Sequence, residues 1–264
     1  MMDQRPPRTI VPLNKSHKKF NPPRTYDHGT TPLIPGYVHC WMKESEMLGQ
    51  KIAQKSLELG AIKISTERPF QWASGYFMPV YNDNRILLSD HEARRLVVSA
   101  MQALLEESGV TVENICGIPT AGLPWGALLA DALELPFIYV RDKAKEHGMR
   151  KQIEGVLHQG QQCVLIEDVV STGGSAVKVV PVLREEGARV ELALAIFSYN
   201  FREGIENFQQ QGVKLRSALT YSTLIEVAKE TGTIKESDLE SLQAWQEDPF
   251  HWGATRGFER VEKA

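Results

Sequence analysis

The chain has 264 residues, of which 42% are hydrophobic and 24% charged, with a formal net charge of −3 at pH 7. This size and composition are typical of a globular protein of one large or two small domains, and the charge gives no reason to expect a nucleic-acid partner. We expect a cytoplasmic protein with reduced thiols. No apolar run reaches the ~20 residues of a membrane span, no signal-peptide core is present, and Cys40, Cys116 and Cys163 lack zinc or disulfide spacing.

The N-terminal stretch differs in composition from the rest of the chain. Residues 1–36 hold seven of the 14 prolines and six basic residues against two acidic ones. Such a segment buries little surface, which predicts a flexible extension. A basic arm for a partner is the alternative interpretation. We therefore divide the chain into this extension (1–36), a small subdomain (37–88), a core (89–231) and a helical tail (232–264).

Two amphipathic helices and a turn-rich segment are predicted next. Apolar spacing indicates helices over 42–59 and 91–108, each followed by glycine. Between them, strands are expected at 61–64 and 76–81, the second closed by the turn Asn82-Asp83-Asn84-Arg85.

From about residue 110 to 230, strands alternate with helices. Short apolar runs predict strands at 115–118, 136–140, 163–166, 189–198 and 213–219, with helices at 123–133, 176–183 and 202–211 between some of them. A last helix is expected at 236–247, followed by Phe250, Trp252 and Phe258 as packing aromatics. Alternation of this kind predicts a doubly wound parallel sheet, an α/β fold with ligands beyond the carboxyl ends of its strands.

The strand at 163–166 leads into two acids and a small polar turn, Glu167-Asp168-Val169-Val170-Ser171-Thr172-Gly173-Gly174-Ser175. Backbone N–H groups of such a turn and the positive end of the next helix can hold a phosphate. The adjacent carboxylates can accept hydrogen bonds from sugar hydroxyls. The turn and the carboxylates together favour a sugar phosphate as the ligand. The turn lacks the lysine of a P-loop and the Gly-x-Gly-x-x-Gly of a dinucleotide site. An ordinary β-α turn with exposed acids is the alternative.

Charge is densest directly after the strand at 136–140. Arg141-Asp142-Lys143-Ala144-Lys145-Glu146-His147-Gly148 forms no amphipathic face and continues without periodicity to Gly155. A loop of this length within a compact domain is usually functional, and its cations can gather around a pyrophosphate. A solvated charge run is the alternative.

These motifs resemble those of type I phosphoribosyltransferases. The acidic pair with its Thr-Gly-Gly turn is similar to the site for phosphoribosyl pyrophosphate (PRPP), and residues 141–155 are similar to the catalytic loop. The segment Pro69-Phe70-Gln71-Trp72-Ala73-Ser74-Gly75 with Asn82–Ser89 resembles the N-terminal hood of orotate phosphoribosyltransferases. That family normally has a lysine where this chain has Phe77. The resemblance covers roughly residues 43–247.

The resemblance implies transfer of a phosphoribosyl group from Mg²⁺-bound PRPP to orotate, by a homodimer whose 141–155 loop acts across the interface. It implies no metal ligand from the protein itself. The implied catalytic residues are Lys143, Lys145, His147 and Asp168. The implied PRPP-binding residues are Arg141, Glu167, Asp168, Val169, Ser171, Thr172, Gly173, Gly174 and Ser175, with Thr120, Ala121 and Gly122 as the pyrophosphate loop. Arg85, Phe77 and Ser171 are the candidates for orotate, although Arg85 also fits a surface salt bridge.

Two other functions stay open at this point. Phe77 leaves room for a phosphoribosyltransferase of another base, a purine or uracil. A regulator that binds PRPP without turnover is the alternative from a different class, against which the lysine-rich loop argues.

Overall fold

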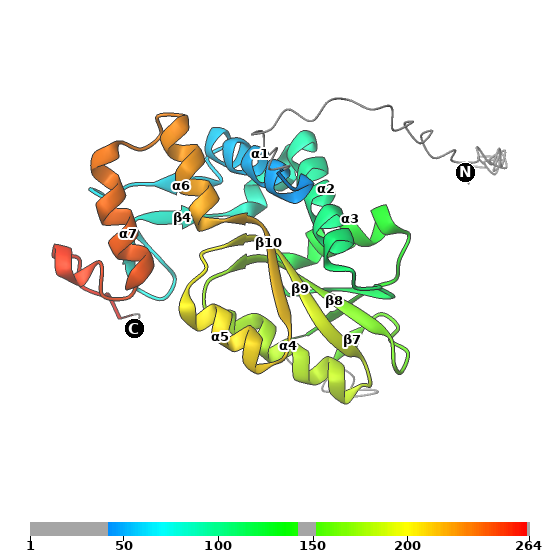
Figure 1. Ribbon diagram of the computed structural model, residues 1–264. Coiled ribbons are helices and arrows are strands. Elements are labelled where there is room, and N and C mark those ends of the chain that lie inside the picture. Colours follow the sequence, from blue (N-terminus) through cyan, green and yellow to red (C-terminus); the bar gives the residue numbers. More distant parts are fainter. Residues whose placement is uncertain (1–41, 142–151, 263–264) are drawn as a thin grey trace, which may run out of the picture. The chain divides into compact units, whose positions relative to one another are not determined.

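The computed structural model describes residues 42–141 and 152–262 (Figure 1). Its main sheet has six strands in the order β10-β9-β8-β5-β6-β7. The strands are β5 (Asn114–Gly117), β6 (Phe137–Val140), β7 (Ile153–Glu154), β8 (Gln162–Val170), β9 (Arg189–Ser198) and β10 (Lys214–Thr220). All neighbours pair in parallel except β6 and β7. The predicted α/β fold with a parallel sheet is confirmed.

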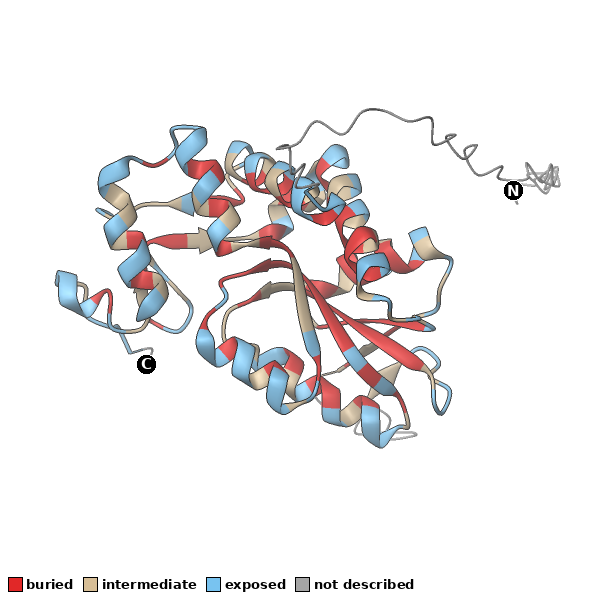
Figure 2. Cartoon of the chain, in the orientation of Figure 1, coloured by how far each residue is buried: buried red, intermediate tan, exposed pale blue. Residues whose placement is uncertain are grey.

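Helices cover both faces of this sheet, which leaves its central strands buried (Figure 2). Alternate residues of β8 belong to two apolar clusters, Val164 and Ile166 to one and Cys163 and Leu165 to the other. The first cluster includes α1 (Glu44–Glu58), α2 (His91–Ser108) and α3 (Gly122–Leu133), and the second α4 (Gly174–Glu185) and α5 (Arg202–Gln210). Burial on both faces explains why the strands have continuous apolar runs.

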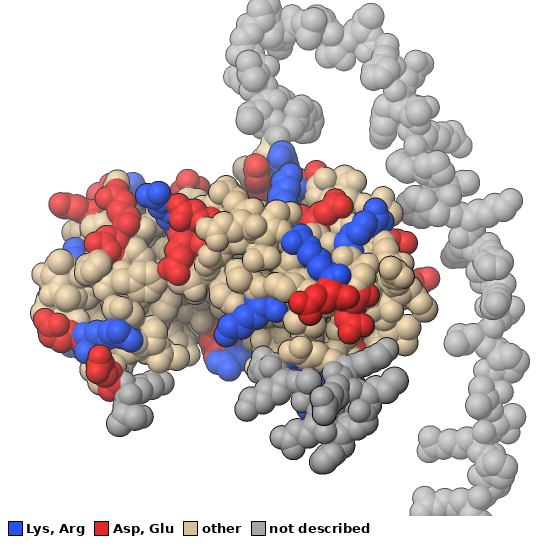
Figure 3. Space-filling model, turned by 90° about the horizontal axis from the view of Figure 1, so that it is seen from below, with Lys and Arg blue, Asp and Glu red and all other residues tan. Residues whose placement is uncertain are grey.

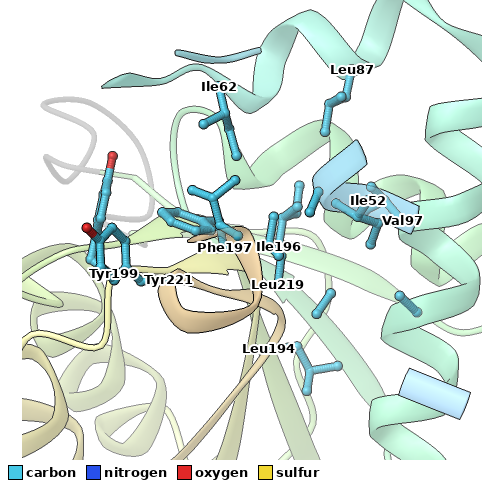
Figure 4. Packing of buried hydrophobic residues seen from close by; sticks show 14 of the residues in the cluster. Ile52, Ile62, Leu87, Val97, Leu194, Ile196, Phe197, Tyr199, Leu219 and Tyr221 are labelled. Atoms are coloured by element: carbon cyan, nitrogen blue, oxygen red, sulfur yellow. The ribbon is translucent and has the colours of Figure 1, made fainter. Parts of the chain in front are cut away.

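Two small antiparallel sheets precede the main sheet. Strand β1 (Ile62–Ile64) pairs with β4 (Val80–Asn82), and β2 (Phe70–Gln71) forms a hairpin with β3 (Phe77–Met78). We call residues 62–89 the hood. Its buried side chains continue the first apolar cluster, which contains Ile62 and Leu87 from the hood together with Ile196 and Phe197 from β9 (Figure 4). One core therefore joins the hood to the main sheet.

The C-terminal elements pack on the same core. They are α6 (Tyr221–Glu230), the 3-10 turn η2 (Glu236–Asp238), α7 (Leu239–Glu247) and the 3-10 turn η3 (Ala254–Arg256). Trp245 of α7 is fully buried and Trp252 is 2% exposed. Ring contacts join Trp245 to Trp72 and Tyr199, with centroid distances of 6.3 and 5.5 Å. The predicted packing role of the C-terminal aromatics is thereby confirmed for Trp252.

Most predicted elements lie where the sequence places them, with three differences. The strand expected at 76–81 is split at Pro79, which has no N–H to donate. Strand β8 continues four residues beyond the predicted 166, because it pairs with β9 as far as Val170 and Ser198. Helix α6 and the short edge strand β7 were not predicted.

The two described cysteines are free thiols, as the sequence predicted, and charged side chains of both signs are mixed on one face of the surface (Figure 3). Cys116 and Cys163 are buried free thiols, and Cys40 lies outside the described residues. Burial raises the pKa of Cys163 to about 12. Acidic and basic side chains are intermixed on the face seen in Figure 3. Within residues 42–141 and 152–262, no helix is both long and apolar enough to cross a bilayer.

The central strand β9 provides a test of the core. Leu194 is fully buried between the helical layers, so Leu194→Ala is expected to lower the free energy of unfolding by about 2–5 kcal/mol in urea denaturation. Met47→Ala, at a side chain that is 46% exposed, is the size-matched control and should change it by less than about 0.5 kcal/mol. Equal effects of the two substitutions would contradict this packing.

Candidate active site

The site lies where the strand order reverses. From β5 the chain moves outward to β6 on one side, whereas β8, β9 and β10 follow on the other side. Such a switch point leaves a crevice beyond the carboxyl ends of the two neighbouring strands, here β5 and β8. The turn after β5 and the acidic pair with its loop at the end of β8 flank this crevice. Both were predicted as functional segments.

The sequence predicted the acidic pair directly after the strand, but both acids lie within the C-terminal half of β8. Glu167 is 7% exposed and Asp168 is half-buried. The Glu167 carboxylate accepts a 3.2 Å hydrogen bond from the Asp168 backbone N–H. Burial, followed by repulsion from Asp168, raises the pKa of Glu167 to about 9. Burial likewise raises the pKa of Asp168, and the attraction of Arg85 does not offset it. A positive charge or hydrogen-bond donors placed beside the pair would therefore stabilise its ionised form.

The loop after β8 contains two glycines whose surroundings differ. Gly173 has φ +73°, and a Cβ there would lie 3.0 Å from the Phe208 ring. Gly174 differs, since a Cβ would meet nothing closer than Thr172 Oγ1 at 3.9 Å. Helix α4 begins at Gly174, so its free N–H groups lie at this loop. Packing and backbone conformation therefore explain the first glycine, whereas the second leaves room for a ligand.

Helix α5 holds the loop from behind. Asn207 Nδ2 donates a 2.8 Å hydrogen bond to the Thr172 carbonyl. A Cβ on Gly204 would collide with the Ser171 carbonyl oxygen, so the helix approaches the loop closely. Sequence reasoning missed both residues, because nothing in a polar helix pattern shows which side chain reaches a loop 35 positions away.

The turn after β5 runs directly into α3. Thr120 and Ala121 precede the helix, and Gly122 is its first residue. A Cβ on Gly122 would collide with the Ile166 carbonyl oxygen of β8, and Ile118 N–H donates to that same carbonyl at 2.9 Å. Glycine is thus required for the packing of α3 on β8. This packing brings the turn alongside the acidic pair.

A cavity of about 380 Å³ lies between the hood and the end of β8. Four of its lining side chains are aromatic, and Trp72 and Tyr199 lie 5.1 Å apart between ring centroids. Asn82 also lines it, and both polar atoms of its amide are buried without a partner among the described residues. The full lining is Trp72, Ala73, Ser74, Tyr81, Asn82, Val169, Ser171, Thr172, Tyr199 and Phe250. A flat ring with polar edges suits these walls.

A second cavity, of about 300 Å³, joins the turn after β5 to the start of α4. Arg141 and Ser175, both predicted as PRPP-binding residues, line it together with Lys178. Arg141 Nη1 lies 3.4 Å from Glu154 Oε1 of β7. The structure thus brings two cations and a helix start together, a combination that suits an anion.

Other predicted residues are placed differently. The Arg85 guanidinium forms a fork on Asp83, at 2.6 and 2.8 Å, and its side chain is 64% exposed. This is the ion pair that the sequence left as the alternative. Phe77 packs on Phe258, with ring centroids 5.8 Å apart. Neither residue is in the lining of the aromatic cavity. Lys143, Lys145 and His147 lie outside the described residues.

Asn84 is a further residue that sequence reasoning missed. It is 1% exposed, and its Nδ2 donates a 2.7 Å hydrogen bond to the Asp168 carbonyl. The hood is thereby tied to the acidic pair. Asn84 lies in a run that was interpreted as a strand-closing turn, and the partner across 84 positions gives no local signal.

Comparison with known proteins identifies the family. The family model described as the phosphoribosyl transferase domain matches residues 87–225, which places the chain in the phosphoribosyltransferase class. The orotate phosphoribosyltransferase of Lactococcus lactis subsp. cremoris (strain SK11) is 42% identical over 207 residues, 78% of this chain and 99% of the relative. The chain belongs to the orotate phosphoribosyltransferase family, which confirms the resemblance noted in the sequence.

Solved structures of orotate phosphoribosyltransferases and of a UMP synthase are also similar to this chain. The orotate phosphoribosyltransferase from Aeropyrum pernix is 30% identical, with a TM-score of 0.56, covering 69% of this chain and 99% of that one. The UMP synthase of Leishmania donovani has a TM-score of 0.65 at 22% identity, and the match covers 75% of this chain and 42% of that one. The second likeness shows the fold alone.

The raised pKa of Glu167 predicts a pH dependence of stability. The folded protein keeps a proton that the unfolded chain loses near its ordinary pKa of 4.5, so this group makes folding less favourable as pH rises from about 4.5 to about 9. Glu167→Gln is expected to raise the thermal midpoint of the ligand-free protein by several degrees at pH 8 and to change it little at pH 5. Thermal unfolding across this range checks it, and equal shifts at both pH values would argue against the buried acid.

The two glycines of the loop make a matched pair of substitutions. Gly173→Ala is expected to lower the free energy of unfolding by about 1–2 kcal/mol, because alanine is strained at positive φ. Gly174→Ala should leave stability unchanged and weaken PRPP binding, since its methyl group enters the space above the loop. Chemical denaturation and titration calorimetry separate the two effects. Unchanged PRPP affinity in Gly174→Ala would exclude a ligand at this position.

Proposed function

We propose that this protein transfers the 5-phosphoribosyl group from PRPP to orotate and releases orotidine 5′-monophosphate and pyrophosphate, a step of pyrimidine nucleotide biosynthesis. The observation that carries the proposal is the buried Glu167–Asp168 pair at the switch point, with an anion loop and an aromatic cavity on either side. Sugar hydroxyls, a phosphate and a flat base each have a matching surface there. The family relatives are named for the same reaction.

Each part of PRPP has its residues in this proposal. The loop of Ser171, Thr172, Gly173, Gly174 and Ser175 holds the 5-phosphate, and Glu167 and Asp168 accept hydrogen bonds from the ribose hydroxyls. Val169 lies between them. Thr120, Ala121 and Gly122 with Arg141 meet the pyrophosphate, and Lys178 beside Arg141 adds a cation. As the bond from C1′ to pyrophosphate breaks, Asp168 stabilises the positive ribose and the cations stabilise the leaving group.

The loop residues Lys143, Lys145 and His147 complete this assignment by their match to the family pattern. Lys143 and Lys145 neutralise the departing pyrophosphate, and His147 donates a hydrogen bond or a proton to it. The loop acts across the interface of a homodimer. We include in the proposal that the dimer is cytoplasmic. Each chain consists of the 1–36 extension, the 37–88 subdomain, the 89–231 core and the 232–264 tail.

Magnesium enters with PRPP. Among the described residues there is no group of three or more His, Cys, Asp or Glu side chains that could hold a metal ion. In the proposal the ion is carried mainly on substrate oxygens, and Asp168 and Glu167 are the protein carboxylates that would contact it. When bound, Mg²⁺ supplies positive charge to the pyrophosphate.

The aromatic cavity is the proposed base site. Trp72 and Tyr199 supply flat apolar walls, and the unpartnered amide of Asn82 offers one donor and one acceptor to the polar edges of a pyrimidine. Ser171 lies in the same lining. Arg85 is the proposed partner of the orotate carboxylate, which requires it to exchange Asp83 for the ligand. Phe77 takes the position of the family lysine.

The test is PRPP- and Mg²⁺-dependent loss of orotate absorbance by the purified protein, beside adenine, hypoxanthine and uracil. We expect turnover of orotate alone, and Lys145→Ala should reduce kcat at least a hundredfold because it removes a charge that stabilises the leaving group. Met47→Ala, on the exposed side of α1, is the control and should keep full activity.

Other outcomes discriminate between the alternatives. Turnover of a purine or of uracil would retain the chemistry and replace the substrate. PRPP binding without turnover of any base would reject the enzyme and favour a PRPP-binding regulator.

A further inference from the structure

The chain that follows α7 returns to the hood. We call residues 248–262 the C-terminal segment. It lies beyond residue 247, where the family resemblance in the sequence ends, and the Lactococcus relative is matched over 99% of its length by only 207 residues of this chain. Trp252 anchors the segment, being 2% exposed with its Nε1 donating a 2.9 Å hydrogen bond to the Ser241 carbonyl.

The end of the segment pairs with the turn of the hood hairpin. Val261 N–H donates a 3.1 Å hydrogen bond to the Gly75 carbonyl, and Arg260 Nε donates a 3.3 Å hydrogen bond to the Ser74 carbonyl. The Arg260 guanidinium also lies 4.6 Å from the centre of the Tyr76 ring. Backbone and side chain thus hold three successive residues of the turn.

The approach is close enough to require glycine on the hood side. Gly75 has φ +86°, and a Cβ there would collide with the Val261 carbonyl oxygen. The hood turn and the C-terminal segment are therefore closely packed against each other at Gly75.

Phe77 belongs to the same interface. Its ring lies 5.8 Å from that of Phe258, and a Cβ on Gly253 would lie 3.0 Å from the Phe77 carbonyl oxygen. An ammonium group in place of this ring would be placed against an aromatic side chain and a packed backbone. The residue that departs from the family pattern is thus one of the hood residues that contact the C-terminal segment.

Phe250 connects this interface to the base cavity. Its ring lies 5.2 Å from Tyr76 in the hood and 6.2 Å from Phe201 after β9. It lines the cavity together with the hood residues Trp72 and Ser74. Of the ten residues that line the cavity, it alone comes from the C-terminal segment.

We infer that the C-terminal segment completes the base-binding half of the active site. Phe250 is a specificity-determining wall against the face of the bound pyrimidine. Phe258, Arg260 and Val261 are positioning residues that fix the Ser74–Phe77 turn at the cavity rim. This inference rests on the proposed function, because it assigns the aromatic cavity to the base and not to the sugar phosphate.

The experiment compares the full chain with Phe250→Ala, Phe250→Tyr and a chain that ends after Gly257. Phe250→Ala should raise KM for orotate about tenfold, as expected for a lost aromatic–base contact. The truncation keeps Phe250 but removes Phe258, Arg260 and Val261, so it should also raise KM for orotate, because the hood turn is no longer fixed at the cavity rim. Both changes should leave KM for PRPP unchanged. Phe250→Tyr should restore a KM for orotate within about twofold of that of the full chain. His251→Ala, at a side chain that is 78% exposed in the same segment, is the matched control and should behave as the full chain does.

The outcomes separate the two proposals. No turnover by the full chain would reject the proposed function itself. Turnover by the full chain with an unchanged KM for orotate in folded Phe250→Ala would overturn the inference and leave the function standing. A parallel rise in both KM values would also overturn it, because it indicates a general structural role. Thermal unfolding monitors each variant, and Phe250→Ala decides the question if the truncated chain does not fold.

Discussion

The burial of two adjacent carboxyl groups at the end of β8 is the constraint on which the site depends. Glu167 and Asp168 repel each other when both are ionised, and burial adds to the cost, so the pKa of Glu167 rises to about 9. Proteins rarely retain such a pair without a use, because replacing it with neutral residues would stabilise the fold. The cost is offset when hydroxyl donors and positive charge bind to the pair, which links the stability of the protein to ligand binding.

The surrounding elements hold this pair and its loop in place from different directions. Asn84 reaches from the hood to the Asp168 carbonyl, and Asn207 reaches from α5 to the Thr172 carbonyl. Helix α3 packs on β8 where only a glycine fits. The C-terminal segment in turn holds the hood turn at the rim of the aromatic cavity. A site assembled from rigid elements in this way is suited to precise positioning of a substrate.

The sequence predicted the sheet, its central helices and the acidic pair because each of these features is encoded by neighbouring residues. Apolar runs on β8 and β9, helical spacing in α2 and the glycines after Thr172 are signals within a few residues of their cause. It did not predict the roles of Asn82, Asn84 and Asn207, which depend on partners or cavities built from distant segments. It placed Arg85 at the ligand, whereas in the structure the Arg85 guanidinium forms an ion pair with Asp83, two residues away. The length of β8 also depended on pairing with β9 that periodicity does not encode.

Proton release on binding tests the central claim most directly. Titration of the protein with Mg²⁺ and PRPP at pH 7, in buffers of different ionisation enthalpy, measures the protons displaced per site. The buried pair predicts release of roughly one proton from the wild-type protein and none from Glu167→Gln, because binding ionises Glu167. Equal proton release from both proteins would contradict the account, as would binding to the wild type with no proton displaced.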